Sequence, residues 1–468
     1  MSKTFIGPKL RQLRISHDLT QADVADRLGV SAAYVNLLEN NQRSLSVKIL
    51  LAISEAFDVD VKELTQDDGA HVLADLRNAF SDTTLEGDPP DVQELRSAIE
   101  RAPAFVDHFL QLHRAHRAAL RVIMRGGSEG RDEKILHASP ETAIHDFFRK
   151  NSNYFAVLEV AAESARHSIS VAPESLFVDL RAGLREIHGV SVEVRPIEEL
   201  GDSLRIYDED SRTLLLSQAL NTENRAFQMA HILAFLTEGR MISRMARNAQ
   251  ADPERVQPRL EVELGNYFAA AFLMPYEDFL ATAESTGYDI DRIALAFGVT
   301  FEQVCHRLTT MQRDKAHGIP FFLLRLDRAG NVTKRFNASS FDLAEYGGAC
   351  PVWNVHAAFS VPGVIFPQFV EMPDGQRFFS ISRTVHRPVF SADTQDRRLT
   401  LTLGCEARHA HRLRYAASFK IDDPTLYQPI GINCQLCPRQ ACSQRAHQPL
   451  FINLPIDANR RGSTRYES

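Results

Sequence analysis

The chain has 468 residues, of which 44% are hydrophobic and 24% are charged, and its net charge is −7. This length predicts about three domains, because one hydrophobic core does not extend over so many residues. No apolar run reaches the roughly 18 residues that a membrane-spanning helix needs, and the start of the chain lacks the apolar region of a signal peptide. We therefore expect an ordinary soluble, cytoplasmic protein without a membrane partner. Six cysteines in so long a chain exclude a disulfide scaffold.

Residues 19–43 have the pattern of two short helices joined by a tight turn. Thr20 is a suitable N-cap for the first helix, and Asp23 follows at the spacing of a capping box. Gly29 provides the left-handed backbone that ends this helix, and Ser31 can cap the second one. Apolar residues at helical spacing predict the buried faces of the two helices, which comprise Val24, Ala25, Leu28, Val35 and Leu38.

The outward face of the second helix is small and polar, which suits insertion into the major groove of DNA. Alanine side chains allow close approach, and amide side chains can hydrogen-bond base edges or phosphates. An ordinary helical hairpin is the alternative, but the order of the residues favours a helix-turn-helix. We predict contacts to double-stranded DNA by Gln21, Ser31, Ala32, Ala33, Tyr34, Asn36, Asn40 and Arg43. The expected target is a palindromic operator, bound by a homodimer or a higher homo-oligomer.

From Ile6 to about Leu64 the sequence resembles the Cro/cI (XRE) family of bacterial repressors. The resemblance implies a lambda-repressor-like, all-α domain of five helices. It also implies a structural ion pair between Arg14, at the end of the first helix, and Glu39 of the recognition helix. Residues 1–50 contain seven Lys or Arg and four Asp or Glu, a local net charge of +3 that suits contact with phosphates.

Further elements follow in chain order. Helices at 47–57 and 61–64 complete the DNA-binding bundle. A helix at 92–124 follows, between a linker at 67–92 that contains one helix and a second linker at 126–133. From residue 140 onward, helices are expected at 144–166 and 175–185, short strands at 190–194, 204–207 and 213–216, and helices at 224–236 and 261–275. The last two of these strands have the pattern of a hairpin through 208–210.

The helices at 224–236 and 261–275 resemble the zinc-binding pair of the ImmA/IrrE metallopeptidases. The second helix matches that family at Glu263, Asn266, Phe268, Ala269, Ala270, Leu273, Met274 and Pro275. In the first helix His231 occupies the place of a zinc ligand, but Ile232 replaces the general base and Phe235 replaces the second histidine. The chemistry requires two histidines at i and i+4 with a glutamate between them. We therefore predict a degenerate zincin-like α+β domain with no catalytic residue and with His231 in its core.

The remainder of the chain turns from helices to strands. Residues 288–313 have the pattern of a small helical unit that packs on the middle domain. Strands at 321–327 and 332–336 flank one turn, strands at 366–371 and 376–384 flank another, and a further strand covers 399–403. An antiparallel sheet is expected.

Cysteines are concentrated near the end of the chain. Cys434 and Cys437 form a Cys-x-x-Cys motif, Cys442 follows, and Cys405 lies upstream, directly after the predicted strand at 399–403. Four thiolates in this arrangement can bind zinc or an iron–sulfur cluster. A set of reduced, buried cysteines is the alternative, and the residues alone do not separate zinc from iron–sulfur.

A helix-turn-helix, a degenerate ImmA/IrrE-type domain and the motif Gly-Ile-Asn-Cys-x-Leu-Cys-x-Arg-x-x-Cys-x-x-Arg-Ala at 431–446 together resemble the short-chain fatty acyl-CoA regulators. The resemblance implies a non-enzymatic transcription factor that senses a short-chain acyl-CoA and controls acetate- or propionate-type carbon metabolism. Some members of that family are reported to carry an iron–sulfur cluster on these cysteines.

The expected fold class is multidomain α+β. A Cro/cI-type domain at 1–66 precedes a helical linker at 67–139, a degenerate ImmA/IrrE-type domain at 140–285 and a C-terminal acyl-CoA regulator domain at 286–468 that contains the antiparallel strands and the cysteine cluster. Two alternatives are a metalloprotease-type regulator that cleaves a partner repressor, and a phage or toxin–antitoxin repressor without a small ligand. The missing glutamate and histidine count against the first, and the length of chain beyond the DNA-binding module counts against the second.

Overall fold

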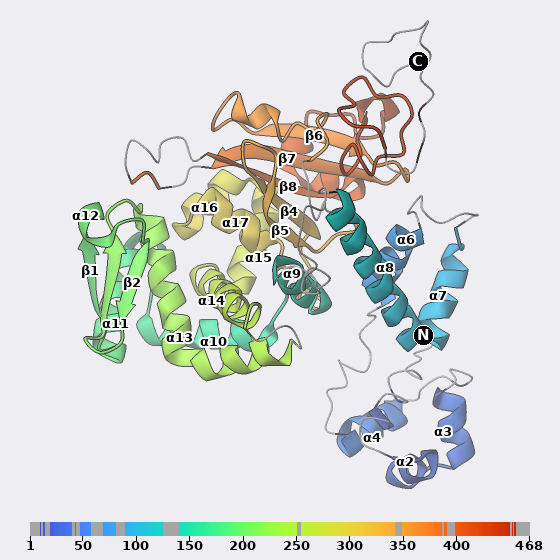
Figure 1. Ribbon diagram of the computed structural model, residues 1–468. Coiled ribbons are helices and arrows are strands. Elements are labelled where there is room, and N and C mark those ends of the chain that lie inside the picture. The colour runs from blue at the N-terminus through green and yellow to red at the C-terminus, as the bar shows by residue number, and fades with distance from the viewer. Residues whose placement is uncertain are drawn as a thin grey trace, which may run out of the picture. The chain divides into compact units, whose positions relative to one another are not determined.

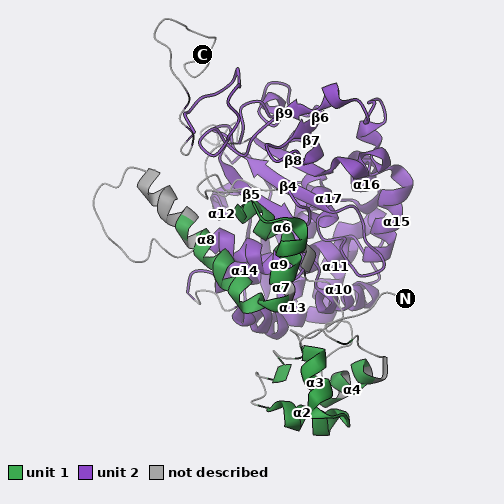
Figure 2. Ribbon diagram, turned by 90° about the vertical axis from the view of Figure 1, so that its right-hand side faces the viewer, with its two compact units in different colours: residues 1–137 green, residues 138–468 purple. Residues whose placement is uncertain are grey.

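The structure is a computed structural model in which the chain divides into two compact units, Met1–His137 and Ala138–Ser468 (Figure 2). The described residues are 10, 13–14, 19–39, 43, 47–57, 69–80, 89–124, 140–249, 254–341, 349–385, 388–390, 398–449, 452 and 454. No helix among them is both long and apolar enough to span a membrane.

The first unit begins with the predicted helix-turn-helix, formed by α2 (Gln21–Leu28) and α3 (Ala32–Glu39) (Figure 1). The capping box is present: the Thr20 hydroxyl accepts from the Asp23 N–H at 3.2 Å, and the Asp23 carboxylate accepts from the Thr20 N–H at 2.8 Å. Gly29 ends α2 with φ of 64°. Helix α4 (Val47–Phe57) completes a small apolar core with α2 and α3. The expected helix at 61–64 lies outside the described residues.

Three further helices of the first unit pack together around Leu76, Leu95, Val106 and Leu110. They are α6 (Gly69–Phe80), α7 (Val92–Arg101) and α8 (Pro103–Met124). The prediction of a single helix at 92–124 is therefore wrong, because the helix is interrupted at Ala102. A residue before proline is sterically disfavoured in the helical region, and Ala102 adopts φ −140° and ψ 53° ahead of Pro103.

The second unit starts with α9 (Pro140–Lys150), α10 (Ala156–Ile169) and α11 (Leu176–His188). The helix predicted at 144–166 is thus two helices. Ser152 and Asn153 between them have positive φ, which a continuing helix does not allow. A three-stranded sheet follows in the order β1-β3-β2, from β1 (Ser191–Arg195), β2 (Arg205–Asp208) and β3 (Thr213–Ser217), with the short helix α12 (Ile197–Leu200) after β1. The predicted β2–β3 hairpin is confirmed, and β1 pairs with β3 in parallel.

Two long helices, α13 (Thr222–Asn248) and α14 (Gln257–Leu273), pack side by side and carry the ImmA/IrrE-like motif. The helical unit expected at 288–313 is present as α16 (Ile290–Phe297) and α17 (Phe301–Leu308), after α15 (Tyr276–Thr286). Helices α15 to α17 lie between α14 and the C-terminal sheet (Figure 1). One apolar core extends from Phe148 to Tyr427, so the middle and C-terminal parts fold as one body.

The C-terminal sheet has six strands in the order β5-β4-β8-β7-β6-β9. The strands are β4 (Phe321–Leu326), β5 (Val332–Asn337), β6 (Phe366–Glu371), β7 (Arg377–Val385), β8 (Leu399–Glu406) and β9 (Gln428–Pro429). Both predicted hairpins are confirmed, and β6–β9 is the parallel pair. One face of the sheet joins the main core, and the other packs on a second core around Phe322, Phe341 and Trp353.

Candidate functional sites

The helix-turn-helix is braced by Glu39, which is buried although it is charged. Arg14 Nε donates to Glu39 Oε1 at 2.7 Å, which is the ion pair that the repressor resemblance implies. Gln21 Nε2 donates to Glu39 Oε2 at 2.7 Å and lies 3.5 Å from Asn36 Oδ1. One carboxylate thus ties Arg14 and α2 to the recognition helix α3.

The recognition helix presents its predicted DNA-contacting face to solvent. Ala32, Ala33 and Asn36 are exposed, whereas Tyr34 is half-buried with the Arg43 guanidinium 5.3 Å from its ring centre. Ser31 Oγ accepts from the Tyr34 N–H at 3.2 Å and so caps α3. The predicted contact Asn40 lies outside the described residues. Small side chains with amides between them form a face that can enter a major groove.

The metallopeptidase-like site contains His231 with both ring nitrogens engaged. Arg205 of β2 donates to His231 Nδ1 at 2.7 Å, so the proton is on Nε2, which donates to the Val262 carbonyl at 3.2 Å. A histidine binds a metal ion through a free nitrogen lone pair, and the Nδ1 lone pair is taken by the guanidinium. This side chain is therefore a satisfied core residue.

Neighbouring side chains pack closely against the His231 ring. The Phe235 ring is 5.1 Å from the His231 ring, and a Cβ placed on Gly265 of α14 would come within 2.9 Å of both side chains. Glu263, at the position of the acidic ligand, is 3.6 Å from Lys334 Nζ of β5 and accepts from Asn266 at 3.3 Å. A lysine therefore neutralises the carboxylate that a metal ion would otherwise bind.

These contacts predict an acid-sensitive contribution to stability. Burial, and then the Arg205 charge, lower the pKa of His231 to about 3, against about 6.5 in the unfolded chain. The unfolded state consequently binds a proton that the folded state excludes, and stability falls as the pH drops from 6.5 toward 3. We expect the melting temperature of His231→Gln to fall less than that of wild type when the pH is lowered from 7.5 to 5. The exposed His167→Gln is the control, and equal slopes in all three proteins would contradict the assignment.

Three of the predicted metal ligands line one cavity at the end of the C-terminal sheet. Cys434, Cys437 and Cys442 contribute to its wall, and the fourth cysteine there is Cys350, which is not among the ligands predicted from the sequence. Asn433 Oδ1 accepts from the Leu436 N–H at 2.9 Å and shapes the Cys-x-x-Cys turn. In the part of the chain that the structure describes, no three His, Cys, Asp or Glu side chains are close enough to form a complete ligand set.

The prediction that Cys405 joins this cluster is wrong. Strand β8 does not end at 403 but continues to Glu406, so Cys405 is inside the sheet, opposite Phe321 and Phe379. Side chains alternate between the two faces of a strand, and Cys405 shares the face of Leu401 and Leu403 in the main core. Cys350 packs on the opposite face. Burial raises the pKa of the Cys405 thiol, which makes it an inert apolar residue.

The lining of the cysteine cavity has the chemistry of a thiolate-bound metal centre by three observations, although its sulfur atoms do not converge on one point in this structure. Four cysteines line the cavity, and four cysteines are the usual ligands of structural zinc and iron–sulfur clusters. Backbone N–H groups approach the sulfurs, and Ala446 N is 3.5 Å from Cys434 Sγ. Burial raises the pKa of Cys350, and backbone hydrogen bonds from Gly431 and Val352 lower it in part. A Cβ on Gly431 would lie 2.7 Å from Cys437 Sγ, so the backbone passes the sulfur as closely as glycine allows.

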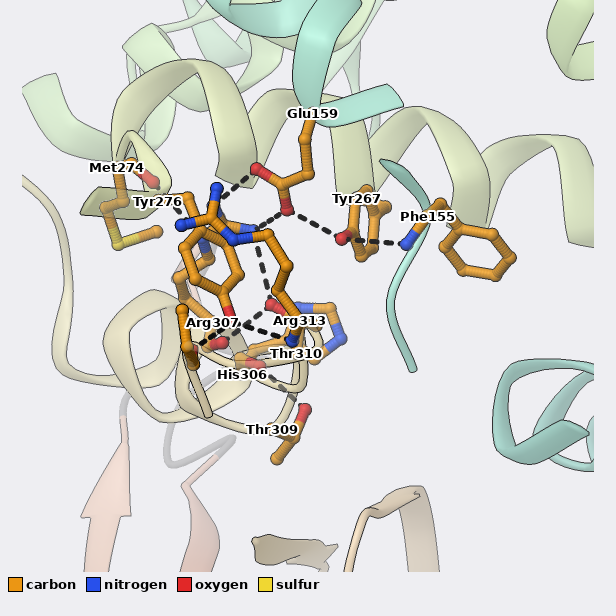
Figure 3. Close-up of polar contacts among 11 residues, drawn as sticks. Phe155, Glu159, Tyr267, Met274, Tyr276, His306, Arg307, Thr309, Thr310 and Arg313 are labelled. Carbon is orange, nitrogen blue, oxygen red and sulfur yellow. Dashed lines mark hydrogen bonds and ion pairs between the residues drawn. The ribbon is translucent and has the colours of Figure 1, made fainter. Parts of the chain in front are cut away.

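A buried ion pair that no local sequence pattern predicts supports the second unit (Figure 3). Arg307 of α17 is fully buried and donates to both oxygens of Glu159 of α10, at 2.6 and 2.8 Å. Tyr267 of α14 donates to the same carboxylate at 2.6 Å. The remaining Arg307 donors reach the Met274 carbonyl at 3.1 Å and the Thr310 hydroxyl at 3.2 Å. Three helices are therefore joined at one satisfied charge pair.

Comparison with known proteins places this chain in a family. The family model for the C-terminal part of short-chain fatty acyl coenzyme A regulators matches residues 310–466, the IrrE N-terminal-like domain matches 185–309, and a helix-turn-helix matches 10–64. The propionyl-CoA carboxylase regulator of Cereibacter sphaeroides is 38% identical over 99% of both chains. The HTH-type transcriptional regulator PrpR of Mycobacterium tuberculosis is 36% identical over 100% of this chain and 96% of its own. The chain belongs to the short-chain fatty acyl-CoA regulator family.

A solved structure of a Mycobacterium tuberculosis transcriptional regulator shares the fold, with a TM-score of 0.67 and 36% identity over 71% of this chain and 100% of that one. Membership makes this protein a helix-turn-helix transcriptional regulator with a DNA-binding module in its first unit. The four cysteines that line the cavity all lie within the C-terminal family match. The cysteine cavity therefore belongs to the part of this regulator that defines the family.

Proposed function

We propose that this regulator senses a short-chain acyl-CoA and adjusts the transcription of acetate- or propionate-type carbon metabolism genes. The observation that carries the proposal is the filled metallopeptidase-like site, in which Arg205 occupies the His231 lone pair and Lys334 neutralises Glu263. An enzyme fold without a free metal site, on the same chain as a DNA-binding module, suits a ligand-sensing role. The names of the C-terminal family and of the Cereibacter sphaeroides relative point to the acyl-CoA class of ligand.

The test is calorimetry with acetyl-, propionyl- and butyryl-CoA on the metal-replete full chain, with free CoA as the control. We expect one short-chain acyl-CoA to bind more tightly than free CoA. Because linkage is reciprocal, operator DNA must change the affinity for that acyl-CoA by the same factor by which the acyl-CoA changes the affinity for DNA. At 100 times its Kd the ligand also adds about 2.7 kcal/mol of apparent stability in a thermal-shift assay. Absence of binding by all three compounds would refute the sensor role.

DNA recognition through α3 gives a separate prediction. Asn36 is exposed on the recognition helix, where its amide can form paired hydrogen bonds with an adenine edge. We expect Asn36→Ala to weaken specific binding to the palindromic operator by about 1–3 kcal/mol, with little change on scrambled DNA. Fluorescence anisotropy at fixed salt measures both affinities. If joint replacement of Ala33, Tyr34 and Asn36 leaves sequence selectivity unchanged, α3 does not read the bases.

We further propose that Cys350, Cys434, Cys437 and Cys442 hold one metal centre, either zinc or an iron–sulfur cluster. The four side chains line a single cavity, and Cys434, Cys437 and Cys442 lie in the loop that follows β9. A bound centre would cross-link this loop-rich segment, and an iron–sulfur cluster would in addition make it sensitive to redox state. Anaerobic purification followed by metal analysis and visible absorption distinguishes zinc, a cluster and no metal.

A further inference from the structure

Arg445 lies in the loop that contains Cys434, Cys437 and Cys442, and it is charged although it is only 6% exposed. Its guanidinium donates to three backbone carbonyls of the surrounding loop: to Cys434 at 3.2 Å, to His447 at 3.4 Å, and to Arg439. These contacts hold together the loop that contains Cys434, Cys437 and Cys442. A further donor of this guanidinium, Nε–H, is buried and has no partner among the described residues.

Such a side chain lacks a counter-charge. An arginine remains protonated under all ordinary conditions, and burial of its charge is costly unless an anion compensates it. Carbonyl dipoles compensate only in part. Within the described residues no carboxylate forms an ion pair with Arg445, in contrast to Arg307, whose two terminal nitrogens both meet Glu159. The local structure therefore contains an unbalanced buried cation.

The anion that fits this position is the metal centre itself. Arg445 lines the same cavity as the four cysteines. A divalent ion or a dicationic cluster held by four thiolates has a net charge of about −2 and sulfurs that accept hydrogen bonds. Both the charge and the free Nε–H would then be satisfied at once.

We propose that Arg445 is the counter-cation of the metal centre and donates its Nε–H to one of the centre's sulfurs. It is a positioning residue, because it acts through the cysteines and does not itself bind the metal. This inference rests on the proposed metal centre and adds to it the side chain that balances its charge. Outer-shell partners of this kind typically change metal affinity by 10–100-fold when they are removed.

The test compares four full-length proteins purified anaerobically: wild type, Arg445→Gln, Arg445→Lys and Arg408→Gln. The last variant removes a positive charge from an exposed residue, Arg408, that pairs with Glu406 at the surface. We expect Arg445→Gln to lose metal to a chelator at least about tenfold faster than wild type. Arg445→Lys should retain metal better than the glutamine variant because it restores the charge. Arg408→Gln should match wild type.

A second readout applies if the centre is a cluster. Loss of a neighbouring positive charge disfavours the reduced, more negative state, so Arg445→Gln should lower the midpoint potential while Arg445→Lys stays near wild type. If glutamine and lysine variants behave alike, Arg445 is a loop staple without a charge role and the inference fails. If wild type is loaded and Arg445→Gln behaves as Arg408→Gln does, the inference fails while the metal centre stands. A wild-type protein without metal would overturn both.

Discussion

Cys350→Ser should abolish the metal centre, whereas Cys405→Ala should leave it intact. The two cysteines are on opposite faces of the C-terminal sheet, and Cys350 alone shares the cavity of Cys434, Cys437 and Cys442. Loss of one of four thiolates removes a large part of the binding free energy of a zinc or cluster site. We therefore expect less than a tenth of the wild-type metal content in Cys350→Ser, measured by elemental analysis after anaerobic purification.

Cys405→Ala is the matched control for this experiment. Its side chain is fully buried in the main core, so the substitution creates a small cavity and lowers stability by about 1 kcal/mol without touching the site. The opposite pattern, with metal retained in Cys350→Ser and lost in Cys405→Ala, would restore the ligand set expected from the sequence. It would also require β8 to end before Cys405.

Glu159→Ala should be among the most destabilising single substitutions in the second unit. Arg307 would remain fully buried with its charge uncompensated, and breaking a buried pair in this way costs about 3–5 kcal/mol. Tyr267 would lose its acceptor at the same time. The single tryptophan, Trp353, is buried on the C-terminal sheet, so its fluorescence during urea unfolding reports on this unit.

Glu163→Ala provides the control, because Glu163 is exposed one turn further along α10. Its effect should stay within about 0.5 kcal/mol. The double variant Glu159→Ala with Arg307→Met should recover part of the loss, since it no longer leaves a buried charge. A loss below about 1 kcal/mol in Glu159→Ala would show that water or a rearranged side chain compensates Arg307.

Local sequence signals determined the elements that depend on neighbouring residues. Thr20 and Asp23 specified a capping box, Gly29 specified a helix end, and the spacing of apolar residues specified the strands of both sheets except β9. The absence of a glutamate at 232 and a histidine at 235 was sufficient to predict a degenerate zinc site. These features can be predicted from the sequence because their physical causes lie within a few residues along the chain.

Tertiary structure decided the features that depend on which distant segments meet. Because β8 continues for three more residues, Cys405 lies on the face of the sheet that is directed away from the cysteine cavity. The fold instead brings Cys350 to the cavity, from 84 residues upstream of Cys434. Glu159 and Arg307 are 148 residues apart, and neither has a local signal for burial. Side-chain direction in a strand reverses with each residue, and ion pairs depend on packing between elements, so no pattern within a short window specifies either.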